Sequence, residues 1–97
     1  MRVRYTPQAL SDLEAVLDSI ERHSPRGARR VQARIKGVID LLPQQPLIGA
    51  RTDDDAIWRF VLTPYPYVLF YEVAGDAVII HAVRHAARSP DSMPGSR

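Results

Sequence analysis

The sequence contains no cysteine, and lysine supplies one of its 13 cationic side chains, the other 12 being arginine. The lack of cysteine excludes disulfide bridges, cysteine-based zinc sites and thiol catalysis, and it fits a reducing compartment. No apolar run reaches the roughly 18–20 residues that cross a bilayer, and the first ten residues lack the apolar region of a signal peptide. We therefore expect a soluble, cytoplasmic protein that does not act at a membrane.

Clustered metal ligands are also missing, because the three histidines lie far apart in the sequence and have no grouped carboxylates beside them. We expect no metal site and no cofactor. The length of 97 residues fits a single domain, which we place at residues 1–88. Residues 89–97 contain two prolines and a glycine without apolar periodicity, so we expect a disordered C-terminal tail.

The charges are segregated along the chain. Residues 7–23 carry four acidic side chains and one arginine, whereas residues 25–40 carry four arginines and a lysine against one aspartate. This order suggests two helices that lie side by side. Arg26, Arg30 and Arg34 follow i, i+4 spacing and form a stripe on one helix face. The stripe is either a solvated face paired with the acidic helix or a docking surface for a partner.

Apolar residues recur at helical spacing in both of these segments. A hydroxyl residue followed by proline opens each segment, at Thr6-Pro7 and at Ser24-Pro25, as is typical of a helix N-terminus. Pro43 and Pro46 end the second segment. The pattern predicts an antiparallel helical hairpin, with apolar faces formed by Leu10, Leu13, Val16, Leu17 and Ile20 and by Ala28, Val31, Ile35, Val38 and Leu42.

From Ile57 onward, β-branched and aromatic residues predict strands at 57–62, 67–73 and 77–83, the last two joined by a tight turn at Gly75-Asp76. Residues 2–5 form a plausible edge strand. The expected fold is therefore α+β with the order β-α-α-β-β-β, in which the helical hairpin packs on a small, mainly antiparallel sheet.

Strand alternation divides the last strand between two faces. It places Ile80, Ala82 and Arg84 on one face, and Ile79, His81, Val83 and His85 on the other. Residues 67–71 are apolar on both faces. Since the helices cover one face, we expect a bare apolar patch on the opposite one, and such a patch usually marks a partner site.

Four segments together resemble the RelE/ParE superfamily of type II toxin–antitoxin toxins. They are the opening of the hairpin at residues 5–13, Trp58 to Leu62, Pro66 to Val73, and Val83-Arg84-His85-Ala86-Ala87-Arg88. The resemblance covers residues 3–88, and the last segment is similar to the ParE-like branch, which includes plasmid stabilisation toxins. It implies a RelE/ParE-like fold and a toxin that forms a hetero-oligomer with a cognate antitoxin.

The resemblance implies two alternative targets. ParE-like toxins poison DNA gyrase by protein contact without catalysis of their own. For this activity we assign target binding to Arg59, His85 and Arg88, with Arg84 as a secondary candidate. RelE-like toxins are metal-independent endoribonucleases that cleave messenger RNA on the ribosome. That activity would use His85 for proton transfer and Arg59, Arg84 and Arg88 for the phosphate, supported by Tyr71.

Two departures from the nuclease pattern favour gyrase. Val68 stands where nucleases of the superfamily tend to carry an arginine, and the chain lacks their dense cluster of lysine and arginine. A third alternative is an inactive homologue that only binds a partner. His85 could also simply cap a strand end. For antitoxin binding we assign the surfaces around Trp58, Phe60, Leu69 and Tyr71.

Overall fold

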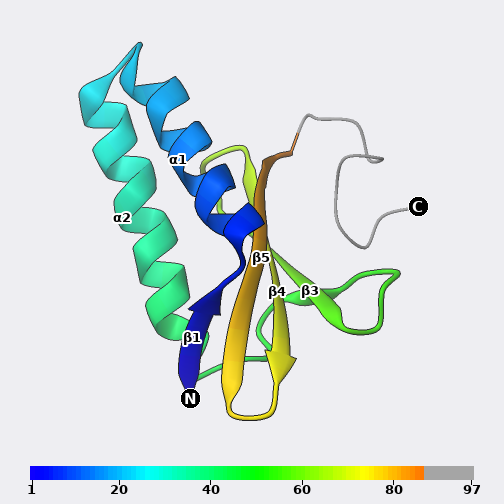
Figure 1. Cartoon of the computed structure of the whole chain (residues 1–97). Helices are drawn as coiled ribbons and strands as arrows, with labels where there is room; N and C mark the ends of the chain where they lie inside the picture. The colour runs from blue at the N-terminus through cyan, green and yellow to red at the C-terminus, as the bar shows by residue number, and fades with distance from the viewer. Residues whose placement is uncertain (87–97) are drawn as a thin grey trace.

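A computed structural model describes residues 1–86; Arg88 and the expected tail lie outside this range. Two helices lie side by side on one face of a five-stranded sheet, which confirms the predicted α+β fold (Figure 1). Neither helix in this range is long and apolar enough to cross a bilayer. The elements are β1 (Arg2–Tyr5), α1 (Pro7–Glu21), α2 (Pro25–Leu41), β2 (Ala50–Arg51), β3 (Ile57–Val61), β4 (Tyr67–Ala74) and β5 (Ala77–His85).

Side-chain caps fix the start of each helix. Thr6 Oγ1 accepts a hydrogen bond from the backbone N–H of Ala9, and Ser24 Oγ accepts one from that of Gly27, with the following proline in the first turn. These bonds satisfy donors that the first turn of a helix otherwise leaves without a partner. The hairpin therefore begins its helices where the sequence predicts them.

The strand order in the sheet is β1-β5-β4-β3-β2. β1 is an edge strand that runs parallel to β5, and the other neighbouring strands are antiparallel. The two-residue strand β2 was not predicted, because it is too short to produce an alternating pattern. β5 continues to His85, two residues beyond its predicted end, so His85 belongs to the strand and not to a following loop.

A β-bulge in β5 overturns the predicted division of its faces. Phe70 pairs with Ala82 but Tyr71 pairs with Ile80, so His81 is an extra residue opposite β4. One extra residue reverses the alternation beyond it. Ile80 and Ala82 therefore lie on opposite faces, and Val83 shares the face of Ile80, contrary to the prediction.

The main core lies between the helices and the sheet. On the sheet it contains Leu69 and Tyr71 of β4 and Val78, Ile80 and Val83 of β5, which with the half-buried Trp58 and Phe60 of β3 we call the helix-side face. The helices contribute Ala9, Val31, Ile35, Val38 and Ile39. Leu10, which the sequence places on the apolar face of α1, is 55% exposed, because Ala9 occupies the buried position instead.

The opposite surface of the sheet, which we call the far face, has a small apolar cluster of its own. Ile57, Val68, Phe70 and Ala82 are each no more than 7% exposed. The prediction of a bare apolar patch is therefore wrong at Val68 and Phe70, which are buried. On the neighbouring strands, Arg59 lies opposite Phe70, Arg84 lies opposite Val68, and Glu72 lies opposite Ile57.

One alternative for the arginine stripe is pairing with the acidic side chains of α1. Among residues 1–86, no ion pair joins an acidic side chain of α1 to a cation of α2. Arg26 and Arg30 are exposed, whereas Arg34 turns to the sheet and donates from Nε to the carbonyl of Thr63. The two helices of opposite charge are therefore neighbours, but within residues 1–86 no ion pair joins them.

Candidate functional site

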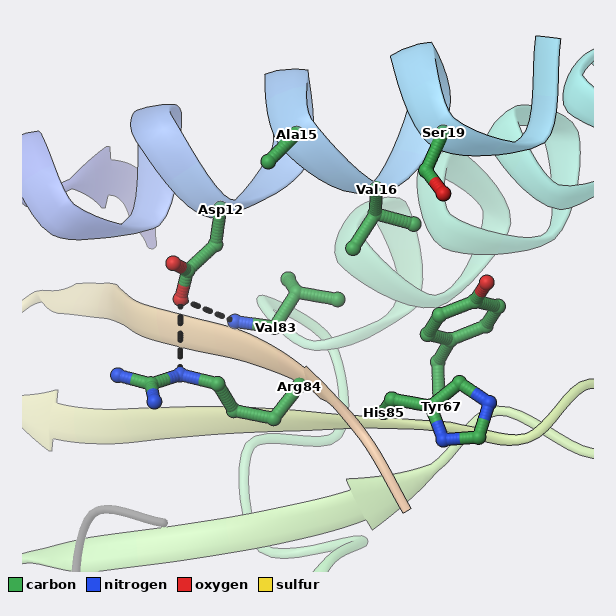
Figure 2. Close-up of a pocket in the computed structure, with 8 residues that line it drawn as sticks. All are labelled: Asp12, Ala15, Val16, Ser19, Tyr67, Val83, Arg84 and His85. Carbon is green, nitrogen blue, oxygen red and sulfur yellow. Dashed lines mark hydrogen bonds and ion pairs between the residues drawn. The ribbon is translucent and has the colours of Figure 1, made fainter. Parts of the chain in front are cut away.

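A cleft of about 220 Å³ opens between α1 and the C-terminal end of β5. Figure 2 shows α1 on one side, with β5 and Tyr67 of β4 on the other. Both apolar and polar side chains line the cleft, a combination that is typical of binding sites. Its lining consists of Asp12, Ala15, Val16, Ser19, Tyr67, Val83, Arg84 and His85.

The Asp12 carboxylate holds one end of this cleft together. Its Oδ2 accepts hydrogen bonds from the backbone N–H of Val83 at 3.1 Å and from Arg84 Nε at 3.2 Å. Its Oδ1 accepts a third from Gln8 Nε2 at 2.7 Å. Figure 2 shows the side chain reaching from α1 to the strand. The site thus includes a charge-assisted link between the first helix and the last strand.

This link replaces a missing strand neighbour. β1 pairs with β5 as far as Ile80, and Thr6 continues the contact by donating from N to the carbonyl of Ile80 and from Oγ1 to that of His81. The chain then turns into α1. Beyond the bulge, the N–H of Val83 therefore meets the carboxylate of a helix instead of a strand carbonyl, and a buried backbone donor is satisfied.

His85 lies at the other end of the cleft, against Tyr67. The two residues are paired across β4 and β5, and their rings make an edge-to-face contact with centroids 5.3 Å apart. The next residue, Ala86, donates from N to the carbonyl of Pro66. The end of β5 is thereby fixed, and His85 lines the cleft on the helix side of the sheet.

The sequence-predicted target residues do not come together. Arg59 is exposed on the far face of β3, and β4 separates that strand from β5. His85 lies on the helix side with Tyr67. Arg84 begins on the far face opposite Val68 and reaches around the strand edge to Asp12. Arg88 lies outside the described residues.

The four residues assigned to antitoxin binding all lie on the helix-side face, but they differ in exposure. Leu69 and Tyr71 are fully buried. Trp58 and Phe60 keep part of their surface, and an arginine covers each ring: the Arg51 guanidinium lies 5.0 Å from the Trp58 ring centroid and that of Arg34 lies 5.9 Å from the Phe60 ring centroid. We call Trp58, Phe60, Arg34 and Arg51 the arginine–aromatic strip.

Tyr71, the suggested support for a nuclease, holds a loop in place. Its hydroxyl donates to the carbonyl of Pro46 at 2.8 Å and accepts from the N–H of Gly49 at 3.0 Å. Burial raises the pKa of Tyr71 above its ordinary value of 10.0, while the Gly49 bond acts in the opposite direction. The hydroxyl is therefore occupied within the fold, as a neutral group.

Sequence reasoning missed Asp12 and Tyr67 as parts of a site. A signal was present for Asp12: it precedes Val16, on the predicted apolar face of the first helix, by four residues, so an acidic side chain lies on that face. Tyr67 gave no comparable signal, because an aromatic residue in an apolar strand is most simply interpreted as part of the hydrophobic core. Among residues 1–86, no three His, Cys, Asp or Glu side chains gather as metal ligands.

Comparison with known proteins agrees with this architecture. A family described as ParE toxin of type II toxin-antitoxin system, parDE, matches residues 3–90. A protein of Caulobacter vibrioides named Toxin RelE2 is 40% identical over 87 residues, which are 90% of this chain and 97% of the relative. A relative from Sinorhizobium fredii is 34% identical over 85 residues, 88% of each chain.

The fold also matches a solved structure titled chromosomal ParDE TA system from P. aeruginosa. The TM-score is 0.73 at 22% identity, covering 88% of this chain and 95% of that one. The family match spans nearly all of the described residues. The chain therefore belongs to the ParE toxin family of type II toxin–antitoxin systems, within the RelE/ParE superfamily.

Proposed function

We propose that this toxin arrests growth by protein contact with DNA gyrase and that a cognate antitoxin neutralises it. The placement of the nuclease candidates carries the choice of gyrase over messenger RNA. Arg59 lies on the opposite side of the sheet from His85, and Arg84, which shares the cleft with His85, is paired with Asp12. A nuclease needs its proton-transfer group and its phosphate-binding cations around a single scissile bond. This separation supports a binding surface over a catalytic centre.

The electrostatics of the site support the same choice. Arg84 donates to the Asp12 carboxylate, so part of its charge is balanced within the fold. Val68, at the position where nucleases of the superfamily tend to carry arginine, is buried in the far-face cluster. A cleft with little excess positive charge suits a protein surface better than a phosphodiester backbone.

For the antitoxin, we propose the arginine–aromatic strip as a docking surface. Trp58 and Phe60 offer apolar contact, while Arg34 and Arg51 offer positive charge next to it. An antitoxin segment that carries acidic residues between apolar ones would complement both. Leu69 and Tyr71 would support this surface from the core without touching the partner.

The target is tested by controlled expression, following DNA synthesis and protein synthesis separately. We expect DNA synthesis to stop first, with a DNA-damage response, and the purified protein to stabilise gyrase-cleaved DNA. Early loss of translation together with cut messenger RNA would replace gyrase with the ribosome. Normal growth would instead indicate an inactive homologue.

His85→Ala separates the mechanisms further. An interface histidine would cost about 1–2 kcal/mol of binding, roughly 5–30-fold, whereas a general acid or base would cost about 10²–10⁴-fold in rate. Val61→Ala is the matched control, because Val61 is an exposed residue of β3 outside the cleft.

The antitoxin surface is tested by measuring affinity for the co-purified antitoxin. We expect Arg34→Ala and Arg51→Ala each to weaken binding by roughly 5–30-fold, because each removes a positive charge that lies over an aromatic ring of the docking surface. Arg26→Ala is the control, because Arg26 belongs to the same helical stripe as Arg34 but is exposed outside the arginine–aromatic strip. We expect this variant to change binding little. Equal losses in all three variants would point to general charge attraction and not to the strip.

A further inference from the structure

The Asp12 carboxylate does more than a backbone cap requires. Satisfying the Val83 N–H needs one neutral acceptor, which an asparagine or a serine could provide. Asp12 instead shares Oδ2 between that N–H and Arg84 Nε, while Gln8 holds Oδ1. The negative charge is thus directed at a guanidinium on the rim of the cleft.

The surroundings of this pair make its geometry rigid. The Asp12 side chain is 12% exposed and the Arg84 side chain 24% exposed, so water screens their interaction less than it would on the open surface. Asp12 comes from a helix that begins at a capped residue, and Arg84 lies on the fixed end of β5. An arginine that a carboxylate holds between rigid elements is suited to oriented recognition of a partner.

The β-bulge at His81 makes this arrangement possible. It brings Val83 to the helix side and leaves Arg84 as the next residue at the strand edge, within reach of α1. Without the extra residue, the alternation would turn the Val83 side chain to the far face and Arg84 to the helix-side face. The bulge and the carboxylate therefore act together on the position of Arg84.

We propose that Asp12 is a positioning residue that fixes the Arg84 guanidinium at the rim of the cleft for contact with the target of the toxin. This inference rests on the proposed function, because it assigns the cleft to target binding. It gives Arg84, a secondary candidate from the sequence, a defined position for target binding, and it gives Asp12 a role through Arg84 without contact of its own.

The first test compares Asp12→Asn with Thr6→Ala. Asp12→Asn keeps the side-chain volume and a neutral acceptor, whereas Thr6→Ala removes the cap of α1 and its bond to the carbonyl of His81 without touching Arg84. We expect Asp12→Asn to lower growth-arrest potency roughly tenfold or more. Thr6→Ala should lower potency less, even where its thermal stability is equal to or lower than that of Asp12→Asn. Potency losses that simply follow stability in both variants would overturn the proposal.

The second test asks whether Asp12 acts through Arg84. We expect the double variant Asp12→Asn/Arg84→Gln to be no weaker than Arg84→Gln alone, because the positioned group is already gone. Additive losses would show that Asp12 contributes independently of Arg84 and would overturn the proposal.

A third readout does not require toxicity. The Arg84 Nε–H resonance can be followed by nitrogen NMR in the intact chain. We expect its shift to move and its hydrogen exchange to accelerate several-fold in Asp12→Asn but not in Thr6→Ala. An unchanged Arg84 signal in Asp12→Asn would refute the positioning role. If the unmodified chain fails to arrest growth, the proposed function fails, and this spectroscopic comparison alone decides the position of Arg84.

Discussion

The two faces of the sheet use the same strands in different ways. On the helix-side face, Leu69 and Tyr71 of β4 join a core to which both helices contribute. On the far face, Val68 and Phe70 belong to a cluster of four residues with charged side chains on adjacent strand positions. The difference shows that burial alone does not define a core. Packing on the helix-side face holds the helices against the sheet, whereas packing on the far face joins only strands that backbone hydrogen bonds already hold together.

The largest effect should come from removing volume on the helix-side face. We expect Leu69→Ala to lower the free energy of unfolding by about 2–5 kcal/mol, because Leu69 is fully buried at the centre of the core. Its control is Val61→Ala on the far side of β3, where 44% exposure predicts a change within about 0.5 kcal/mol. Urea titrations measure both values, and similar losses would erase the contrast between the faces.

The next largest change in stability should come from a substitution at Gly49, where the loop after α2 contacts β3 and Tyr71. A Cβ at Gly49 would lie 2.4 Å from the carbonyl oxygen of Arg59 and 2.8 Å from Tyr71 Oη, so we expect Gly49→Ala to cost about 1–3 kcal/mol. A Cβ at Gly37, on the exposed side of α2, would meet no atom within 4 Å apart from its chain neighbours and the backbone of its own helix, and Gly37→Ala should stabilise the chain by about 0.4–1 kcal/mol. Thermal unfolding distinguishes these opposite signs.

Tyr71→Phe tests the polar part of the helix-side face. It removes the bonds to Pro46 and Gly49, and we expect a loss on the order of 1–2 kcal/mol in the free energy of unfolding at neutral pH. An unchanged stability would mean that water replaces the hydroxyl at this loop.

The same variant provides a pH test with a defined sign. The pKa of Tyr71 is raised on folding, so the folded state binds this proton more tightly than the unfolded state does. The stability from Tyr71 is therefore complete below about pH 10 and is lost as the pH rises through the raised pKa. The advantage of the unmodified chain over Tyr71→Phe should shrink in this range. A constant difference would contradict a buried, neutral phenol.

The smallest effect should come from the polar pair next to the far-face cluster. His81 Nε2 lies 2.8 Å from Glu72 Oε1, and both side chains are about 30% exposed. We expect Glu72→Gln to change stability by less than about 1 kcal/mol, because partial exposure screens the pair and the amide can still hydrogen-bond. A much larger loss would indicate that the bulge at His81 depends on this contact.

Local features of the sequence predicted most of the fold. Thr6-Pro7, Ser24-Pro25 and the helical spacing of apolar residues placed both helices, and the turn at Gly75-Asp76 placed the hairpin of β4 and β5. These features act between neighbours in the chain, and their physical basis is backbone geometry and capping. The order of family-like segments likewise indicated the toxin superfamily.

The candidate site depended on contacts that no local pattern encodes. The bulge at His81 arises from the pairing of β4 with β5, and it reversed the faces that alternation had predicted. Asp12 meets Val83 and Arg84 across more than 70 residues of chain because β1 ends where α1 crosses the edge of β5. The sequence by itself thus determined both helices, every strand except β2, and the family, through interactions between near neighbours. The tertiary structure alone decided which side chains share a face and form the cleft, because strand register and edge pairing are properties of the assembled sheet.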